Sequence, residues 1–278
     1  MKAYAKINLA LDIIGKRADG YHELATVMQR ISLSDDITLA ERADGVRIRC
    51  DTPGVPKDER NIVWKAADAF SRYTGIDVKH ICFIIEKHIP DGAGLGGGSS
   101  DGAAALILLD EHFDTRLTTA EKTNILTPVG ADIPFFLYGG TALCEGIGER
   151  VTPLQPLAGY CVLVKPSFSV STPQAYAAYD ASPAAVHPDV AAMCAAICAG
   201  DLRRTAALIG NVLQPCAEQQ FPYIKELERQ LMSQGALGAR MTGSGSAVFG
   251  IFEDAARAKT AADALYAPGL SVFCCAFC

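Results

Sequence analysis

Five glycines lie within the seven residues from Gly92 to Gly98 of this 278-residue chain. An apolar, β-branched run at residues 81–85 precedes them, and a helix-like run, Ala103–Leu109, follows. Glycine tolerates positive φ and lets the backbone lie close to a ligand. The free N–H groups and the dipole at the start of a helix attract phosphate. The strand, the glycine loop and the helix together therefore predict a cradle for nucleotide phosphates.

The residues of this loop leave other interpretations open. The loop lacks the lysine that the phosphate loop G-x-x-x-x-G-K-[ST] requires. Gly92, Gly94 and Gly97 fit G-x-G-x-x-G. A dinucleotide-binding fold would continue to a strand that ends in an acid, whereas the residues that follow here are polar. Besides the nucleotide-phosphate cradle and the dinucleotide-binding loop, the third interpretation is a glycine-rich turn without a ligand. At the helix start, Ser99 or Ser100 is the expected N-cap.

Two polar side chains share one face of the first expected strand. Apolar residues alternate from Ile7 to Ile13, which is strand periodicity. This alternation places Lys6 and Asn8 together on the face opposite the core. Periodicity alone favours a solvated charge for Lys6.

Three turns carry further candidates. The turn at residues 18–20 delivers Tyr21 and His22 to the next expected strand. Asp132 stands just before an Ile-Pro pair, and an acid followed by a proline is a common helix start. A helix N-cap is therefore one interpretation of Asp132, beside a role in chemistry. The TGSGS segment, Thr242–Ser246, joins two expected strands, and as a lone motif it predicts a hairpin.

The net charge and the cysteines limit the class of partner. The net charge is −6, without a cluster of lysine or arginine, which argues against nucleic acid or an anionic membrane as a partner. An acidic protein that binds nucleotide needs positive charge at the site itself, from Mg²⁺, a few basic side chains and a helix start. Several of the ten cysteines lie within apolar runs, which is typical of reduced thiols. Finding neither a signal peptide nor a long apolar run, we expect a cytoplasmic protein.

Strands and helices alternate along the chain, which predicts an α+β fold. Asn61–Tyr73 is expected to form a capped amphipathic helix ended by Gly75, and a short helix is expected at Thr119–Leu126. Ser34–Asp36 is expected to be a turn, and Glu145–Leu154 a hairpin that closes the first half.

Prolines 153 and 156 mark the expected boundary between two domains, residues 1–154 and 155–278. In the second half, strands are expected at 160–164, on both sides of the TGSGS turn and at 270–277. Helices are expected at 172–179, 190–209 with a break near Gly200, after Pro222, and at 254–266.

Four segments, read together, resemble one protein family. They are KINLALDIIGKRADGYHEL, the glycine loop, GADIPFFLYGGTALCEGIGE and ARMTGSGSAVFGIF, in that order. The glycine loop resembles that of the galacto-, homoserine-, mevalonate- and phosphomevalonate-kinase superfamily. The full set, from Lys6 to about Phe252, resembles the 4-diphosphocytidyl-2-C-methyl-D-erythritol kinase family, which the Gly-Tyr-His turn separates from its relatives.

The resemblance implies a fold and an activity. The fold would be the two-domain α+β fold of small-metabolite kinases, with an N-terminal ATP-binding domain and a C-terminal substrate-side domain. The activity would be Mg²⁺-dependent transfer of phosphoryl from ATP to the 2-hydroxyl of 4-diphosphocytidyl-2-C-methyl-D-erythritol, a step of the non-mevalonate isoprenoid route. Another small-alcohol kinase of the superfamily, or a non-catalytic nucleotide- or metabolite-binding protein, is the alternative. We expect a monomer or a homodimer.

The resemblance also assigns roles to the reacting groups. It places the general base at Asp132 and the countercharge at Lys6, and an aspartate beside a lysine stays ionised and can accept the hydroxyl proton. Asn8 could hold either the carboxylate or the acceptor hydroxyl. The ATP-binding residues would be Pro90, Gly94, Leu95, Gly96, Gly97, Gly98, Ser99 and Ser100.

The same resemblance implies a substrate pocket. Tyr21 and His22 would read the cytosine, one by stacking and one by its polar edge, and Tyr176 would lie across the base. Judged without the family, Tyr21 is a turn-flanking residue, His22 a surface residue and Tyr176 a core residue. Gly243 and Ser244 would line the site.

Two positions depart from the family's pattern. Gly102 stands where the family has alanine, and Gly in a helix interior costs about 1 kcal/mol relative to Ala. Thr127-Pro128 could shift Asp132. Neither departure removes a reacting group.

Overall fold

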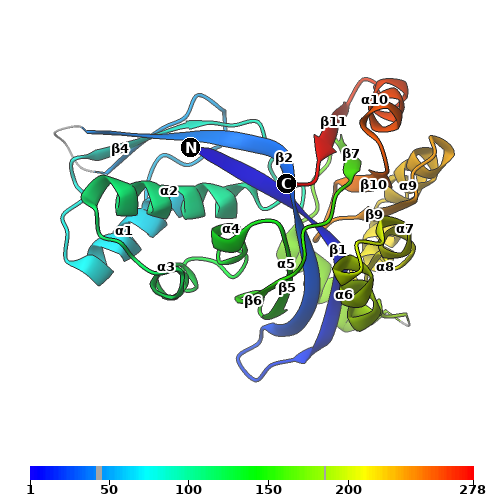
Figure 1. Ribbon diagram of the computed structural model, residues 1–278, viewed down its shortest axis with the longest axis horizontal. Coiled ribbons are helices and arrows are strands. Elements are labelled where there is room, and N and C mark those ends of the chain that lie inside the picture. Colours follow the sequence, from blue (N-terminus) through cyan, green and yellow to red (C-terminus); the bar gives the residue numbers. More distant parts are fainter. Residues whose placement is uncertain (42–45, 185) are drawn as a thin grey trace.

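A long antiparallel hairpin forms the centre of the molecule (Figure 1). The computed structural model describes residues 1–41, 46–184 and 186–278. Strand β1 (Lys2–Lys16) pairs along its length with β2 (His22–Glu41). The larger sheet has the order β3-β4-β2-β1-β8, with β5 paired to β2 and β6 to β5. Its other strands are β3 (Arg47–Arg49), β4 (Ile81–Glu86), β5 (Thr141–Gly146), β6 (Arg150–Pro153) and β8 (Gly210–Asn211).

Helices from the first half of the chain pack on the larger sheet. They are α1 (Ile62–Thr74), α2 (Gly97–Phe113), α3 (Thr119–Leu126) and α4 (Phe135–Tyr138). Phe70 of α1, Phe83 of β4 and Leu106 of α2 are fully buried in one core cluster between these elements. This packing fixes the direction of α2, whose N-terminus points toward the middle of β1 (Figure 1).

A smaller antiparallel sheet carries the second half, in the order β11-β7-β10-β9. Its strands are β7 (Tyr160–Pro166), β9 (Gly238–Met241), β10 (Val248–Phe252) and β11 (Leu270–Ala276). Its helices are α5 (Thr172–Ala181), α6 (Val190–Cys198), α7 (Leu202–Ala207), α8 (Gln214–Gln220), α9 (Tyr223–Ser233) and α10 (Ala255–Ala264). The two halves share a core in which Ile7 and Leu9 of β1 belong to one cluster with Phe249 of β10. Strand β8 comes from the second half yet pairs with β1, and the division at residue 154 stays a prediction.

Several predicted elements are confirmed. Helix α1 is capped by Asn61, whose side chain accepts from the Val63 N–H, and it ends at Gly75 with φ of 76°. Helix α3 occupies Thr119–Leu126 as expected, with a complete capping box from Thr118. The hairpin of β5 and β6 is also as expected.

Two expected boundaries are wrong. No turn forms at Ser34–Asp36, because β2 runs straight through it with Asp35 completely buried. Helix α2 begins at Gly97, with Gly96 at the N-cap in the left-handed conformation, so neither Ser99 nor Ser100 caps it.

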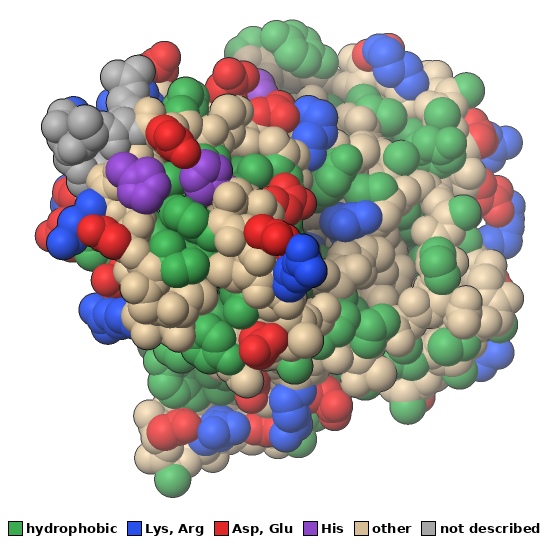
Figure 2. Space-filling view, turned by 60° about the vertical axis from the view of Figure 1, so that its left-hand side comes forward, with side chains coloured by type: hydrophobic (Ala, Val, Ile, Leu, Met, Phe, Trp, Pro, Cys, Tyr) green, Lys and Arg blue, Asp and Glu red, His purple; other side chains and the backbone are tan. Residues whose placement is uncertain are grey.

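Charges of both signs are interspersed on the face shown in Figure 2, and, grey atoms apart, no continuous basic patch covers it. Among the described residues, no helix combines the length and apolar composition that crossing a membrane requires.

Candidate active site

One large cavity, of about 1040 Å³, lies where the two halves meet. The glycine loop, β1, the β1–β2 turn, the segment before α4, helix α5 and the 243–245 turn all contribute to its wall. The sequence-predicted residues that line it are Lys6, Asn8, Tyr21, His22, Pro90, Gly94, Leu95, Gly96, Gly97, Gly98, Ser99, Asp132, Tyr176, Gly243 and Ser244. Ser100 lies outside this lining, since it is buried in α2 and its N–H bonds the Gly96 carbonyl at 2.9 Å.

The glycine loop needs its glycines for two physical reasons. Gly92, Gly94 and Gly96 all have positive φ, between 60° and 75°, which side chains rarely adopt. A Cβ on Gly94 would also lie 2.2 Å from the Thr242 carbonyl oxygen. The loop therefore packs directly on the turn after β9, and an Ala247 N–H to Ala93 carbonyl hydrogen bond of 3.3 Å ties the two together.

The start of α2 offers free donors to the cavity. The N–H groups of Gly97, Gly98 and Ser99 belong to the first turn and have no intrahelical acceptor, and the N-cap residue Gly96 has no side chain that could accept from them. All three residues line the cavity. Donors of this kind, reinforced by the helix dipole, bind phosphate oxygens.

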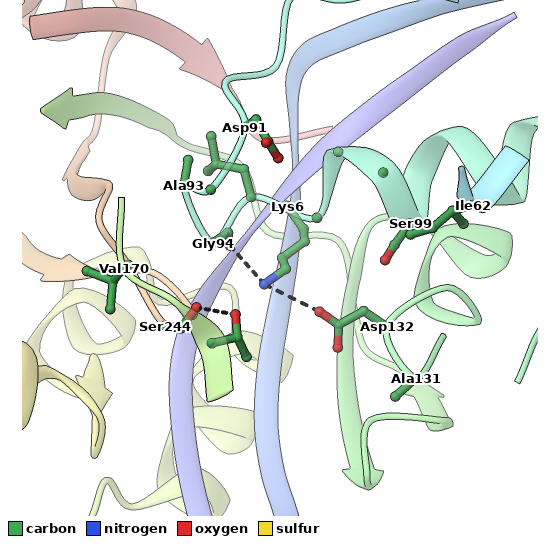
Figure 3. A pocket seen from close by; sticks show the side chains of 18 of the residues that line it. Lys6, Ile62, Asp91, Ala93, Gly94, Ser99, Ala131, Asp132, Val170 and Ser244 are labelled. Carbon is green, nitrogen blue, oxygen red and sulfur yellow. Dashed lines mark hydrogen bonds and ion pairs between the residues drawn. The ribbon is translucent and has the colours of Figure 1, made fainter. Parts of the chain in front are cut away.

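Lys6 is buried, not solvated as periodicity alone suggested. The glycine loop covers the face of β1 that carries Lys6. The backbone N–H of Lys6 donates to the Leu95 carbonyl at 3.0 Å. Its ammonium donates to Asn8 Oδ1 at 2.6 Å and to the Gly94 carbonyl at 3.0 Å. The Asp132 carboxylate lies 3.7 Å from the same nitrogen, as Figure 3 shows. A charged ammonium thus stands between the glycine loop and a carboxylate.

Asn8 holds the Lys6 ammonium in place through its side-chain amide. Its Oδ1 accepts from Lys6, its Nδ2 donates to Thr26 at 2.8 Å, and its backbone N–H donates to Thr242 Oγ1 at 3.0 Å. The residue is 1% exposed. These contacts orient Lys6 and join β1 to the turn after β9.

Asp132 lies in the turn between α3 and α4. It does not cap a helix, because α4 begins at Phe135 with Pro134 at its N-cap. Its side chain is 36% exposed and faces Lys6 across the cavity (Figure 3). The carboxylate is therefore accessible to a hydroxyl group placed between it and the glycine loop.

The predicted base-binding residues lie at the other end of the cavity. The His22 ring stacks on the Tyr176 ring, with centroids 4.9 Å apart and planes at 28°. Tyr21 is 60% exposed at the tip of the β1–β2 hairpin. Ser244 is held by a 2.8 Å hydrogen bond to Thr172, at the start of α5.

Sequence reasoning missed a buried ionic cluster beneath the glycine loop. Asp35 Oδ1 accepts from the N–H groups of His88 and Ile89, at 2.5 and 2.8 Å. The Lys87 ammonium contacts Asp35 and also donates to Asp101 at 2.8 Å. Burial raises the pKa of Asp101, although the Lys87 charge opposes this effect. The cluster anchors both ends of the loop to β2. Sequence reasoning missed it because it expected a turn at Ser34–Asp36.

The Lys6 ammonium is expected to titrate below the ordinary lysine value of 10.5. Burial lowers the pKa of Lys6, and the charge of Asp132 partly offsets this. If the ammonium form supplies the countercharge that the family resemblance implies, kcat/KM should fall as the pH rises through this lowered pKa. Loss of the offset in Asp132→Asn should lower the pKa further, which NMR titration of the Lys6 side chain measures. A Lys6 midpoint at or above 10.5 in the wild-type protein would contradict the expectation.

Comparison with known proteins places the chain among kinases. The GHMP kinases N terminal domain model matches residues 61–140, and the GHMP kinases C terminal model matches residues 193–269. A 4-diphosphocytidyl-2-C-methyl-D-erythritol kinase of Clostridium novyi (strain NT) is 42% identical over 263 residues, covering 93% of this chain and 92% of that protein.

Solved structures agree with this placement. A crystal structure of 4-(cytidine 5'-diphospho)-2C-methyl-D-erythritol kinase superposes with a TM-score of 0.83 at 33% identity, covering 100% of this chain and 99% of that chain. L. major mevalonate kinase, crystallised with R-mevalonate, has a TM-score of 0.76 at 17% identity, covering 99% and 94%. The second likeness shows a shared fold.

Proposed function

The chain belongs to the 4-diphosphocytidyl-2-C-methyl-D-erythritol kinase family of the GHMP kinases, and we propose that it phosphorylates the 2-hydroxyl of 4-diphosphocytidyl-2-C-methyl-D-erythritol with ATP. This reaction is the kinase step of the non-mevalonate isoprenoid route. The observation that carries the proposal is the Lys6–Asp132 pair, 3.7 Å apart, at the mouth of the glycine loop.

The residues divide the chemistry of phosphoryl transfer between them. Asp132 takes the proton as the O–H bond of the acceptor hydroxyl breaks, and that oxygen forms the new bond to the γ-phosphorus. The bond from the γ-phosphorus to the bridging oxygen breaks, and ADP leaves with the electron pair. Lys6 and the N–H groups of Gly97–Ser99 face the negative charge that the phosphoryl oxygens carry, which is where countercharge lowers the barrier.

The lining also fits a divalent cation. Mg²⁺ prefers oxygen ligands and usually takes one or two carboxylates beside substrate phosphates. Asp101 lines the cavity, and its Oδ1 is buried without a hydrogen-bond partner in the described residues. Asp101 would hold the ion, which when bound supplies further countercharge to the phosphates.

The substrate end is proposed to bind the cytidine diphosphate part. Tyr21 and Tyr176 offer aromatic faces to a base, and His22 offers its ring edge. Gly243 and Ser244 line the path between this end and the glycine loop. We also propose division into domains at residue 154, a monomer or homodimer, and a cytoplasmic location, the last supported by ten cysteines that are all free.

An ADP-release assay tests the proposal directly. Purified protein with Mg²⁺ and ATP is expected to turn over 4-diphosphocytidyl-2-C-methyl-D-erythritol, and to leave homoserine, mevalonate and phosphomevalonate unreacted. Rapid turnover of one of those three, without reaction of the cytidyl compound, would assign the chain to a sister activity. ATP binding without turnover of any of the four would favour a non-catalytic binding protein.

A further inference from the structure

Asp180, near the end of α5, reaches back to the β1–β2 hairpin. Its Oδ1 lies 2.7 Å from Nε2 of His22, and its Oδ2 accepts from the Lys16 ammonium at 2.6 Å. Lys16 and His22 are direct partners in the register of the hairpin. One carboxylate therefore holds both strands of the hairpin against α5, at the end of the cavity where the base is proposed to bind.

This contact decides which nitrogen of His22 carries the proton. Hydrogen bonds from Lys16 and His22 lower the pKa of Asp180, so its carboxylate is ionised at neutral pH and can only accept. The proton must then lie on Nε2 of His22. A neutral imidazole with its proton on Nε2 has a lone pair on Nδ1.

The other ring nitrogen is available to a ligand. Within the described residues, Nδ1 of His22 has no hydrogen-bond partner and is not among the buried atoms that lack one. The ring lines the cavity, and stacking on Tyr176 holds its plane. An oriented acceptor therefore stands at the edge of the proposed base site.

We propose that Asp180 is a positioning residue that sets base specificity, by holding the His22 proton on Nε2 so that Nδ1 accepts from an exocyclic amino group. Cytosine presents such an amino donor, whereas uracil presents a carbonyl acceptor at the same position. The proposal rests on the proposed function, because it places the base of the substrate beside His22. It adds the reason why a cytidine compound is preferred to its uridine counterpart.

Asparagine at position 180 should reverse the polarity of the contact. The Lys16 ammonium would take the amide oxygen, leaving the amide NH₂ to donate to Nε2 of His22. The His22 proton would then move to Nδ1, which becomes a donor and suits the uracil carbonyl. The matched control is Asp36→Asn, because Asp36 also pairs with a lysine, Lys2, and lies near a histidine, His88, away from the cavity.

Side-chain ¹⁵N NMR of the histidines tests the proton position without any substrate. The chain has five histidines, and His22→Gln identifies the His22 signals by their loss. At neutral pH the wild-type protein should show His22 protonated on Nε2 alone, and Asp180→Asn should show protonation on Nδ1. A wild-type His22 protonated on Nδ1, or on both nitrogens, would overturn the proposal even if the variant fails to fold.

Calorimetric binding of CDP and UDP tests the consequence. The wild-type protein and Asp36→Asn should bind CDP more tightly, and Asp180→Asn should reduce the ratio of the UDP and CDP dissociation constants by roughly tenfold or more. The ATP dissociation constant should not change. An unchanged ratio in Asp180→Asn, or equal CDP and UDP binding by the wild-type protein, would overturn the proposal. Selective CDP binding without turnover of the cytidyl compound would refute the proposed function alone.

Discussion

Replacing Asp132 by asparagine is expected to lower kcat by about 10²- to 10⁴-fold, the usual contribution of a general base. Asparagine keeps the shape of the side chain but cannot accept the hydroxyl proton. The Asp132 side chain is 36% exposed and caps no helix, and it forms an ion pair with Lys6 across the cavity. The KM values should therefore change little, whereas the free energy of unfolding should fall, because the buried Lys6 ammonium loses the carboxylate that partly offsets its burial. Steady-state ADP release together with urea unfolding measures all of these quantities.

A double variant tests whether Asp132 and Lys6 act together on one transition state or have independent effects on the rate. If Asp132 and Lys6 act on one transition state, Lys6→Met combined with Asp132→Asn should be hardly slower than the slower single variant, because residues that act as a unit are non-additive. Multiplicative losses in the double variant would show two independent effects. A single Asp132→Asn variant with near wild-type kcat would remove Asp132 from the role of base.

The glycine loop could be predicted because its residue types alone indicate the backbone conformation. Positive φ at Gly92, Gly94 and Gly96 requires residues without a side chain, and a helix after a glycine loop predicts anion binding wherever it occurs. Helix α1 could be predicted for a similar reason, since its cap, its apolar stripe and its terminal glycine are all local signals.

Other parts of the site depend on contacts between distant segments, which local patterns do not encode. Alternation in β1 correctly paired Lys6 with Asn8, but it could not show that the glycine loop, some 88 residues later, covers that face. Asp35 was predicted to lie in a turn because the local sequence does not show its partners. These are Lys87 and the two N–H groups that follow it, just after the end of β4. Asp180 had no signal at all, since its meaning comes from His22, 158 residues away.

Alanine at Gly94 is expected to abolish most of the activity, by 10²-fold or more, because a shift of about 1 Å in a positioned group can cost this much. The new Cβ would lie 2.2 Å from the Thr242 carbonyl oxygen and 3.3 Å from the Gly245 nitrogen. Both are backbone atoms and cannot rotate away, so the loop and the turn after β9 must separate. The Gly94 carbonyl accepts from Lys6 at 3.0 Å and from Thr242 at 3.3 Å, so separation also displaces the ammonium.

Gly75 supplies a control with the same backbone conformation and no neighbours. Its φ is 76°, against 75° at Gly94, but a Cβ there would meet nothing within 4 Å. Gly75→Ala should therefore lose only the cost of the left-handed conformation, roughly 1–2 kcal/mol of unfolding free energy, with kcat and KM for ATP unchanged. Gly94→Ala should lose more stability than this in urea unfolding, as well as its activity. Equal loss of stability and retained turnover in the two variants would mean that the loop does not need its contact with Thr242, and that Lys6 is positioned by β1 alone.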